Sequence, residues 1–136
     1  MSPTMARRAG LVLTGLFGLF MTFDVAIKLL DLPVVGETLG ALGWPAGMAR
    51  GIGVLQLVLL VLYLVPRTAV LGAVLLTGML GGAVATHLRV GSPLLSHTLF
   101  GVYLGLLAWG GLLLRDARLR AVFPFAERGE DGIARP

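Results

Sequence analysis

Four apolar stretches divide the sequence, and each has a length that suits a membrane helix. They run over about residues 9–30, 48–65, 68–88 and 96–114. The first holds roughly 22 residues, which as a helix would measure about 33 Å and would cross the hydrocarbon core of a bilayer. Pro66 separates the second stretch from the third, because its ring cannot donate a helical hydrogen bond. The pattern predicts an all-α fold, an integral membrane four-helix bundle formed by a single domain over residues 1–136.

The composition favours a lipid solvent over a soluble core. Of the 136 residues, 57% are hydrophobic and only 13% are charged, whereas a soluble domain carries about 25% charged residues. The net charge is +4, but the basic residues flank the apolar stretches, so we expect the lipid bilayer and no nucleic acid as a partner. The chain has no cysteine, which excludes disulfides and thiol chemistry by this chain itself.

The distribution of arginines predicts the orientation in the membrane. One end of the four stretches carries the larger group: Arg7, Arg8, Arg67, Arg115, Arg118 and Arg120. The other end carries Lys28, Arg50 and Arg89. The richer side of a membrane protein is normally cytoplasmic. We therefore expect both termini and the tail 115–136 in the cytoplasm, and a multi-pass protein of the bacterial inner membrane.

The segment 31–47 is too short and too broken to span, so we expect an interfacial outer loop. It could lie on the bundle as an interfacial flap, with Trp44 at headgroup depth, and cover the mouth of a pocket, or it could be an ordinary aromatic-belt loop. Small residues four positions apart predict close helix packing; the pairs are Gly47 and Gly51, Gly78 and Gly82, and Gly101 and Gly105. His97 shares a helical face with the last pair, so it is expected to point at a neighbouring helix. A homo-oligomer stays an open alternative.

The polar groups of the spans gather at the expected outer end. Asp24 and Lys28 are four residues apart, and an acid that precedes a base by one helical turn predicts an ion pair. Pairing lowers the cost of a charge in a membrane helix, which is about 2.5–3.5 kcal/mol at mid-helix. We predict a polar pocket open to the outer leaflet, in which this pair captures a ligand. The candidate ligand-binding residues are Asp24, Lys28, Gln56, His87, Arg50, Arg89 and His97.

Each of these residues also has a structural interpretation. The ion pair could only lock its helix against a neighbour, and Gln56 could be an interhelical clasp. The histidines could contact lipid headgroups, and Arg50 and Arg89 could anchor helix ends at phosphates or supply Asp24 with a second cation. We expect no metal and no haem, because two histidines around one loop match no known ligand spacing and cannot reach both faces of a haem.

Four pieces of the sequence resemble the DoxX-like family of small four-helix bacterial membrane proteins. They are GLFGLFMTFDVAIKLL (15–30), LGWP (42–45), GIGVLQLVLLVLYLVPRTAVLGAVLLTGMLGGAVATHL (51–88) and HTLFGVYLGLLAW (97–109). The resemblance implies a four-helix protein of the bacterial inner membrane. The family takes its name from subunits associated with quinol oxidation and thiosulfate:quinone oxidoreduction. Gln56 stands where relatives often carry a glutamate, which weakens a proton-carrying role at that position.

Three function classes follow from the residues and the resemblance together. The first is an accessory or ligand-binding subunit whose pocket holds a quinone headgroup, a lipid headgroup or a partner protein. The second is the membrane subunit of a quinone-linked oxidoreductase with a redox partner subunit. We assign no catalytic residue and expect no enzyme in the chain alone, because two histidines are its only cofactor anchors. The third is a small transporter, which the nearly apolar inner halves of the spans disfavour.

Overall fold

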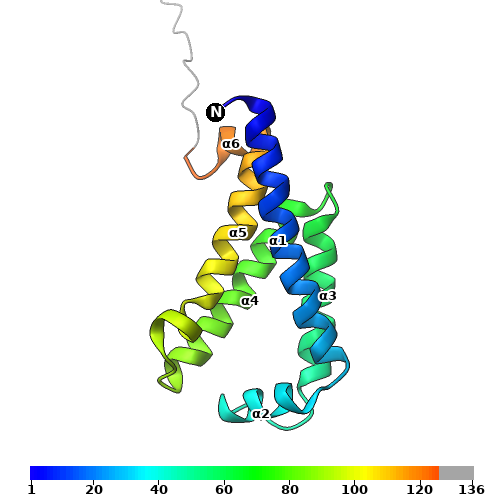
Figure 1. Ribbon diagram of the computed structural model, residues 1–136, viewed down its shortest axis with the longest axis vertical. Helices are drawn as coiled ribbons and strands as arrows, with labels where there is room; N and C mark the ends of the chain where they lie inside the picture. The colour runs from blue at the N-terminus through cyan, green and yellow to red at the C-terminus, as the bar shows by residue number, and fades with distance from the viewer. Residues whose placement is uncertain (126–136) are drawn as a thin grey trace, which may run out of the picture.

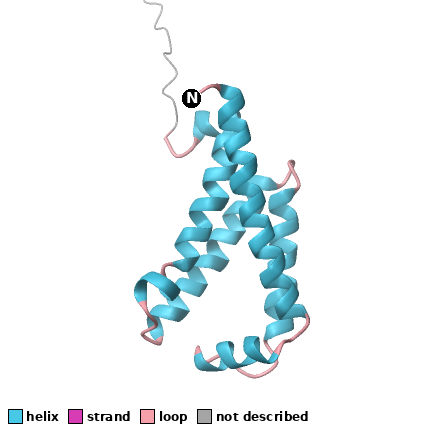
Figure 2. Ribbon diagram, viewed as in Figure 1, coloured by secondary structure: helices cyan, strands magenta, loops and turns pink. Residues whose placement is uncertain are grey.

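The computed structural model describes residues 1–125, and its regular elements in that range are all helical. Four long helices form the body of the molecule: α1 (Pro3–Leu29), α3 (Ala49–Leu64), α4 (Ala69–Arg89) and α5 (Phe100–Arg115). Three short elements join or extend them: α2 (Pro33–Ala41), the π-helical turn η1 (Leu94–Thr98) and α6 (Ala117–Val122). Figure 2 shows that helices dominate the described chain and that short loops connect them.

Three of the predicted spans are confirmed as helices long and apolar enough to cross a membrane. They are Pro3–Leu29, Ala69–Arg89 and the segment Leu94–Arg115. The helix in place of the predicted span 48–65 is α3, which is apolar but has 16 residues. At 1.5 Å per residue it measures about 24 Å, which is less than the ~30 Å hydrocarbon core.

The first helix begins at Pro3, earlier than the start predicted near residue 9. Ser2 caps this end, because its Oγ accepts a hydrogen bond from the Met5 amide at 3.2 Å. A serine cap followed by a proline in the first turn is a strong helix start. The prediction from the apolar run covered only the part of the helix that suits lipid, and it left out the more polar residues at the start of the helix.

The four long helices pack in a closed order, in which α1 contacts α5 and α3, and α4 contacts α3 and α5. Figure 1 shows that these helices lie together at the end that holds the N-terminus and α6, and diverge toward α2. We call the first the terminal end and the second the α2 end. The α3–α4 turn lies toward the terminal end, and η1 lies at the α2 end (Figure 1).

The tightly packed core lies in the half of the molecule nearest the terminal end. Its largest fully buried apolar side chains are Tyr63, Phe17, Met21 and Leu76. Tyr63 of α3 meets Phe17 of α1 edge to face, with ring centroids 5.1 Å apart. The Tyr63 hydroxyl donates to the Ala108 carbonyl of α5 at 2.6 Å. One buried tyrosine therefore ties three of the four long helices together.

Replacing Tyr63 with phenylalanine is expected to lower the free energy of unfolding by about 1 kcal/mol, the net value of one hydrogen bond. Thermal unfolding of the purified protein in one detergent would measure it. Tyr103 is the matched control, because its hydroxyl also donates to a carbonyl, that of Leu95 at 2.9 Å, but the residue is exposed. Equal effects of the two phenylalanine variants would contradict the assigned role of Tyr63.

The closest helix contacts depend on glycines that the spacing rule did not select. A Cβ on Gly72 of α4 would lie 2.2 Å from the Tyr63 amide nitrogen, which is main chain of α3. A Cβ on Gly111 of α5 would lie 2.6 Å from the Thr14 Oγ1 of α1. Neither position tolerates a side chain without movement of a helix.

Only the last of the three predicted glycine pairs packs against a neighbouring helix. A Cβ on Gly101 would lie 3.0 Å from the Leu80 carbonyl oxygen, so this face of α5 does approach α4. The prediction was wrong for the other two pairs, which have open space around them: Gly47, Gly51, Gly78 and Gly82. Small-residue spacing identifies a smooth helix face, but it does not say whether a helix or lipid covers that face.

Two further segments differ from the prediction. The expected loop 31–47 contains the helix α2, which begins at Pro33 in the favoured first-turn position for proline. The expected tail 115–136 contains α6, whose start is capped by Asp116: its Oδ1 accepts from the Arg118 and Leu119 amides at 3.0 and 3.2 Å. The remainder of that tail, 126–136, lies outside the described residues.

Candidate functional site: a cavity at the α2 end

The divergence of the helices leaves a cavity of about 560 Å³ at the α2 end. Side chains from α1, α2, α3, α4, η1 and α5 line it. Most of the wall is apolar, with Phe20, Val35, Leu80, Val84, Phe100 and Leu104 among its residues. Phe20 and Phe100 meet edge to face with centroids 5.2 Å apart. A volume of this size, with few polar groups, is typical of a small-molecule site.

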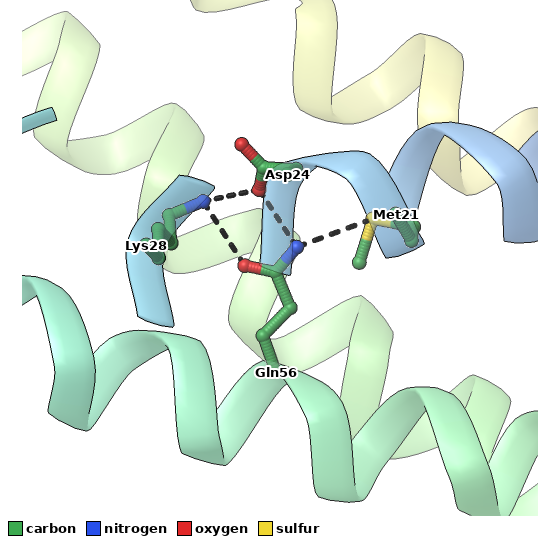
Figure 3. A network of polar contacts seen from close by, with 4 residues as sticks. All are labelled: Met21, Asp24, Lys28 and Gln56. Carbon is green, nitrogen blue, oxygen red and sulfur yellow. Dashed lines mark hydrogen bonds and ion pairs between the residues drawn. The ribbon is translucent and has the colours of Figure 1, made fainter. Parts of the chain in front are cut away.

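The polar part of the wall is a network of Asp24, Lys28 and Gln56, shown in Figure 3. Lys28 Nζ pairs with Asp24 Oδ2 and also donates to Gln56 Oε1 at 3.1 Å. Gln56 Nε2 in turn donates to Asp24 Oδ2 at 2.7 Å and contacts Met21 Sδ at 3.7 Å. Each of the three polar side chains therefore contacts the other two.

The local structure explains why these three side chains meet. Asp24 and Lys28 lie one turn apart on α1, as the spacing predicts, and Gln56 reaches them from α3. Gly53 lies about one turn before Gln56, and a Cβ there would lie 3.0 Å from Lys28 Cβ. The absence of a side chain at Gly53 lets α3 approach α1, which brings the Gln56 amide to the ion pair. Gln56 is 1% exposed.

The network retains unused hydrogen-bonding capacity. Within the described chain, Asp24 Oδ1 accepts no hydrogen bond, and Figure 3 shows it turned away from Gln56. Lys28 has three N–H donors and uses two of them. One carboxylate and one ammonium also leave the network with no net charge. The site can therefore offer one acceptor and one donor to a ligand without a net electrostatic preference for an ion.

The two histidines form a second polar group on the cavity wall. His87 Nδ1 lies 2.9 Å from Ser92 Oγ, and His97 Nδ1 lies 2.7 Å from Ser96 Oγ. The two rings are 6.0 Å apart between centroids. His97 belongs to η1 rather than to the regular helix predicted over 96–114. The histidines share the cavity with the Asp24 network, but none of the described hydrogen bonds joins the two groups.

Arg50 and Arg89, which were predicted with this site, do not line the cavity. Arg50 is exposed. Arg89 Nη2 donates to the Leu42 carbonyl at 2.7 Å, at the end of α2. The second cation expected near Asp24 is therefore not supplied by either arginine. Among residues 1–125, no cluster of three or more His, Asp or Glu side chains is suited to a metal ion.

The sequence analysis left open a flap over the pocket, but it missed that this segment is a helix whose side chains line the cavity wall. Val34, Val35, Thr38, Leu39 and Leu42 all line the cavity, as does Trp44 just beyond the helix. A signal was present, because these positions recur at the three- and four-residue spacing of one helical face after Pro33. The glycines between them made the segment look like a loop.

A model of the DoxX-like family matches residues 12–111. The chain belongs to the DoxX-like family. The matched range includes every residue that lines the cavity of this DoxX-like protein, and it ends before α6. No curated protein and no solved structure matches the chain. The family match and the apolar helices together identify a DoxX-like membrane protein, and the cavity is its best-formed candidate site.

Proposed function

We propose that this DoxX-like protein is a single-domain four-helix bundle of the bacterial inner membrane that binds a small amphipathic ligand in the cavity. In this proposal α3 is the fourth span, both termini are cytoplasmic, and the α2 end faces outward. The arginine distribution supports this orientation. Arg7 and Arg8 lie near the start of α1, and Arg67 lies in the α3–α4 turn, and both segments are toward the terminal end (Figure 1). The short α3 is accommodated by local thinning of the bilayer or by tilt of its neighbours.

The observation that carries the proposal is the neutral polar network on an otherwise apolar wall. Asp24 Oδ1 can accept from a hydroxyl, and the third N–H of Lys28 can donate to a carbonyl. A phosphate or carboxylate placed there would meet the Asp24 carboxylate as well as the Lys28 ammonium. The network therefore favours an uncharged headgroup with oxygen donors or acceptors, carried on an apolar body that fills the rest of the cavity.

Of the headgroups considered from the sequence, a quinone fits this chemistry better than an anionic lipid. A quinone carbonyl can accept from Lys28, and the hydroxyl of its reduced form can donate to Asp24. The surrounding Phe20, Phe100 and Leu104 side chains suit an aromatic ring. The role would be that of an accessory or ligand-binding subunit, and as an alternative that of the membrane subunit of a quinone-linked oxidoreductase.

The packing of the other half of the molecule favours binding over transport. Phe17 and Tyr63 are both fully buried between the cavity and the terminal end. Transport would need a polar or water-filled path past them, and the core cluster to which both belong is built of apolar side chains. The polar groups beside it are the Arg115 guanidinium, 5.5 Å from the Tyr63 ring centroid, and the buried Thr14; no described hydrogen bond connects either of them with the Asp24 network.

The proposal predicts a stoichiometric, uncharged molecule in the purified protein. The protein would be isolated in a mild detergent with native lipids, and its organic extract analysed by mass spectrometry. We expect a quinone that is lost in Asp24→Asn and retained in Asp31→Asn, which changes an exposed carboxylate at the same end. An anionic lipid that follows the same pattern would contradict the uncharged headgroup. Identical extracts from all three proteins would contradict the binding site.

A further inference from the structure

The helix α2 covers part of the mouth of the cavity and is lightly attached to the rest of the molecule. Val35 and Leu39 face the cavity, whereas Gly36 and Gly40 have open space around them. Figure 1 shows α2 crossing the α2 end from the side of α1 and α3 toward the side of α4. Of the long helices, α2 packs chiefly against α3. One end of α2 is therefore held on the side of α1 and α3, and the other end extends across the cavity toward α4.

A hydrogen bond from Arg89 fastens the far end of α2 to the opposite side. Arg89 lies in the last turn of α4, and its Nη2 donates to the carbonyl of Leu42, the C-cap of α2, at 2.7 Å. Within residues 1–125, no other hydrogen bond joins the segment 31–47 to α4, η1 or α5. A single side chain therefore bridges the two sides at this point.

Gly43, which follows Leu42, leaves space for the Arg89 guanidinium. Gly43 has a φ of +83°, in the left-handed region that disfavours other residues. A Cβ at this position would lie 2.9 Å from Arg89 Nη2. A side chain at Gly43 would thus both strain the turn and push Arg89 away from the Leu42 carbonyl. Gly47 gives a comparison, because its φ is +82° but a Cβ there would meet nothing within 4 Å.

We propose that α2 is a lid over the cavity and that Arg89 is the latch that fastens it to α4. The proposal goes beyond the binding of any ligand, because it concerns access to the cavity and can be tested without one. A charged donor bonded to one carbonyl biases an equilibrium by about tenfold or more, and exposure of Arg89 sets the effect at the low end of that range. Loss of this bond is therefore expected to shift α2 toward positions away from α4 while the long helices stay folded.

The test measures access to the cavity through a single introduced thiol. The chain has no cysteine, so Val84→Cys, at a half-buried position on the α4 wall of the cavity, places the only thiol there. Its modification rate with a charged, water-soluble methanethiosulfonate would be measured in proteoliposomes with reagent on both sides. We expect Arg89→Gln and Gly43→Ala, each in this background, to raise the rate by about tenfold.

The controls separate the latch from charge and strain. Arg50→Gln removes an equal charge at the same end of the molecule, and Gly47→Ala introduces an equal backbone strain; both should leave the rate near that of the parent. Each variant's thermal midpoint and elution profile would establish that it is folded. Should Arg89→Gln not fold, Gly43→Ala against Gly47→Ala decides the result. Rates that are equal within either matched pair would overturn the latch, whether or not a quinone is found.

Discussion

Replacing Gly72 by alanine is expected to abolish most of the folded protein. The added Cβ would lie 2.2 Å from the Tyr63 amide nitrogen and 2.5 Å from the Tyr63 Cα. Both atoms are main chain, so no side-chain rotation can relieve the clash, and α3 and α4 must separate. Overpacking of a close core usually costs about 1–3 kcal/mol, and we expect Gly72→Ala to reach at least the upper end. Folded yield and thermal midpoint in detergent would measure the loss.

Gly78→Ala is the matched control for this experiment. It lies on the same helix, and a Cβ there would meet nothing within 4 Å. Alanine is the better helix former by roughly 1 kcal/mol, so this variant should be unchanged or more stable. Equal loss in both variants would indicate that α4 tolerates no alanine for a reason other than contact with Tyr63, and would contradict the packing of α3 on α4.

The sequence was sufficient where a local pattern determined the structure. The apolar runs predicted the long helices, because in lipid a single segment can hydrogen-bond all of its backbone N–H and C=O groups only as a helix. The four-residue spacing of Asp24 and Lys28 predicted their contact, since such positions are neighbours on any α-helix. The placement of Gln56 near them required only that the first and second apolar helices pack side by side.

The remaining features depend on contacts between distant residues, which no local pattern contains. α2 has two glycines in nine residues, and its propensity for a helix is correspondingly low; of its residues Val35 alone is buried, on the side that lines the cavity. Arg89 donates a hydrogen bond to Leu42, which is 47 positions away. The sequence predicted only an anchor to lipid headgroups at this position, because no local pattern shows so distant a contact. Gly72 packs on α3 without a small residue four positions on, and the spacing rule therefore passed over it.

The Asp24–Lys28 ion pair is expected to contribute both to stability and to ligand binding. The variant Lys28→Met measures its contribution to stability. Loss of Lys28 leaves the Asp24 carboxylate with Gln56 as its remaining described partner. Removal of one member of a fully buried pair costs about 3–5 kcal/mol. Because the Asp24 side chain is 26% exposed, we expect about 2 kcal/mol, seen as a lower thermal midpoint in detergent. An unchanged midpoint would show that the carboxylate is well solvated without its lysine.

The double variant Asp24→Asn with Lys28→Met then separates a structural pair from a binding site. It removes both charges, and an asparagine can still exchange a hydrogen bond with Gln56, so most of the lost stability should return. The ligand should not return, because the free carboxylate oxygen and the ammonium donor are both gone. A double variant that is stable and retains the extracted molecule would assign Asp24 and Lys28 to helix packing alone. A stable variant without it would show that the network binds the ligand directly, since the fold that surrounds the cavity would be intact.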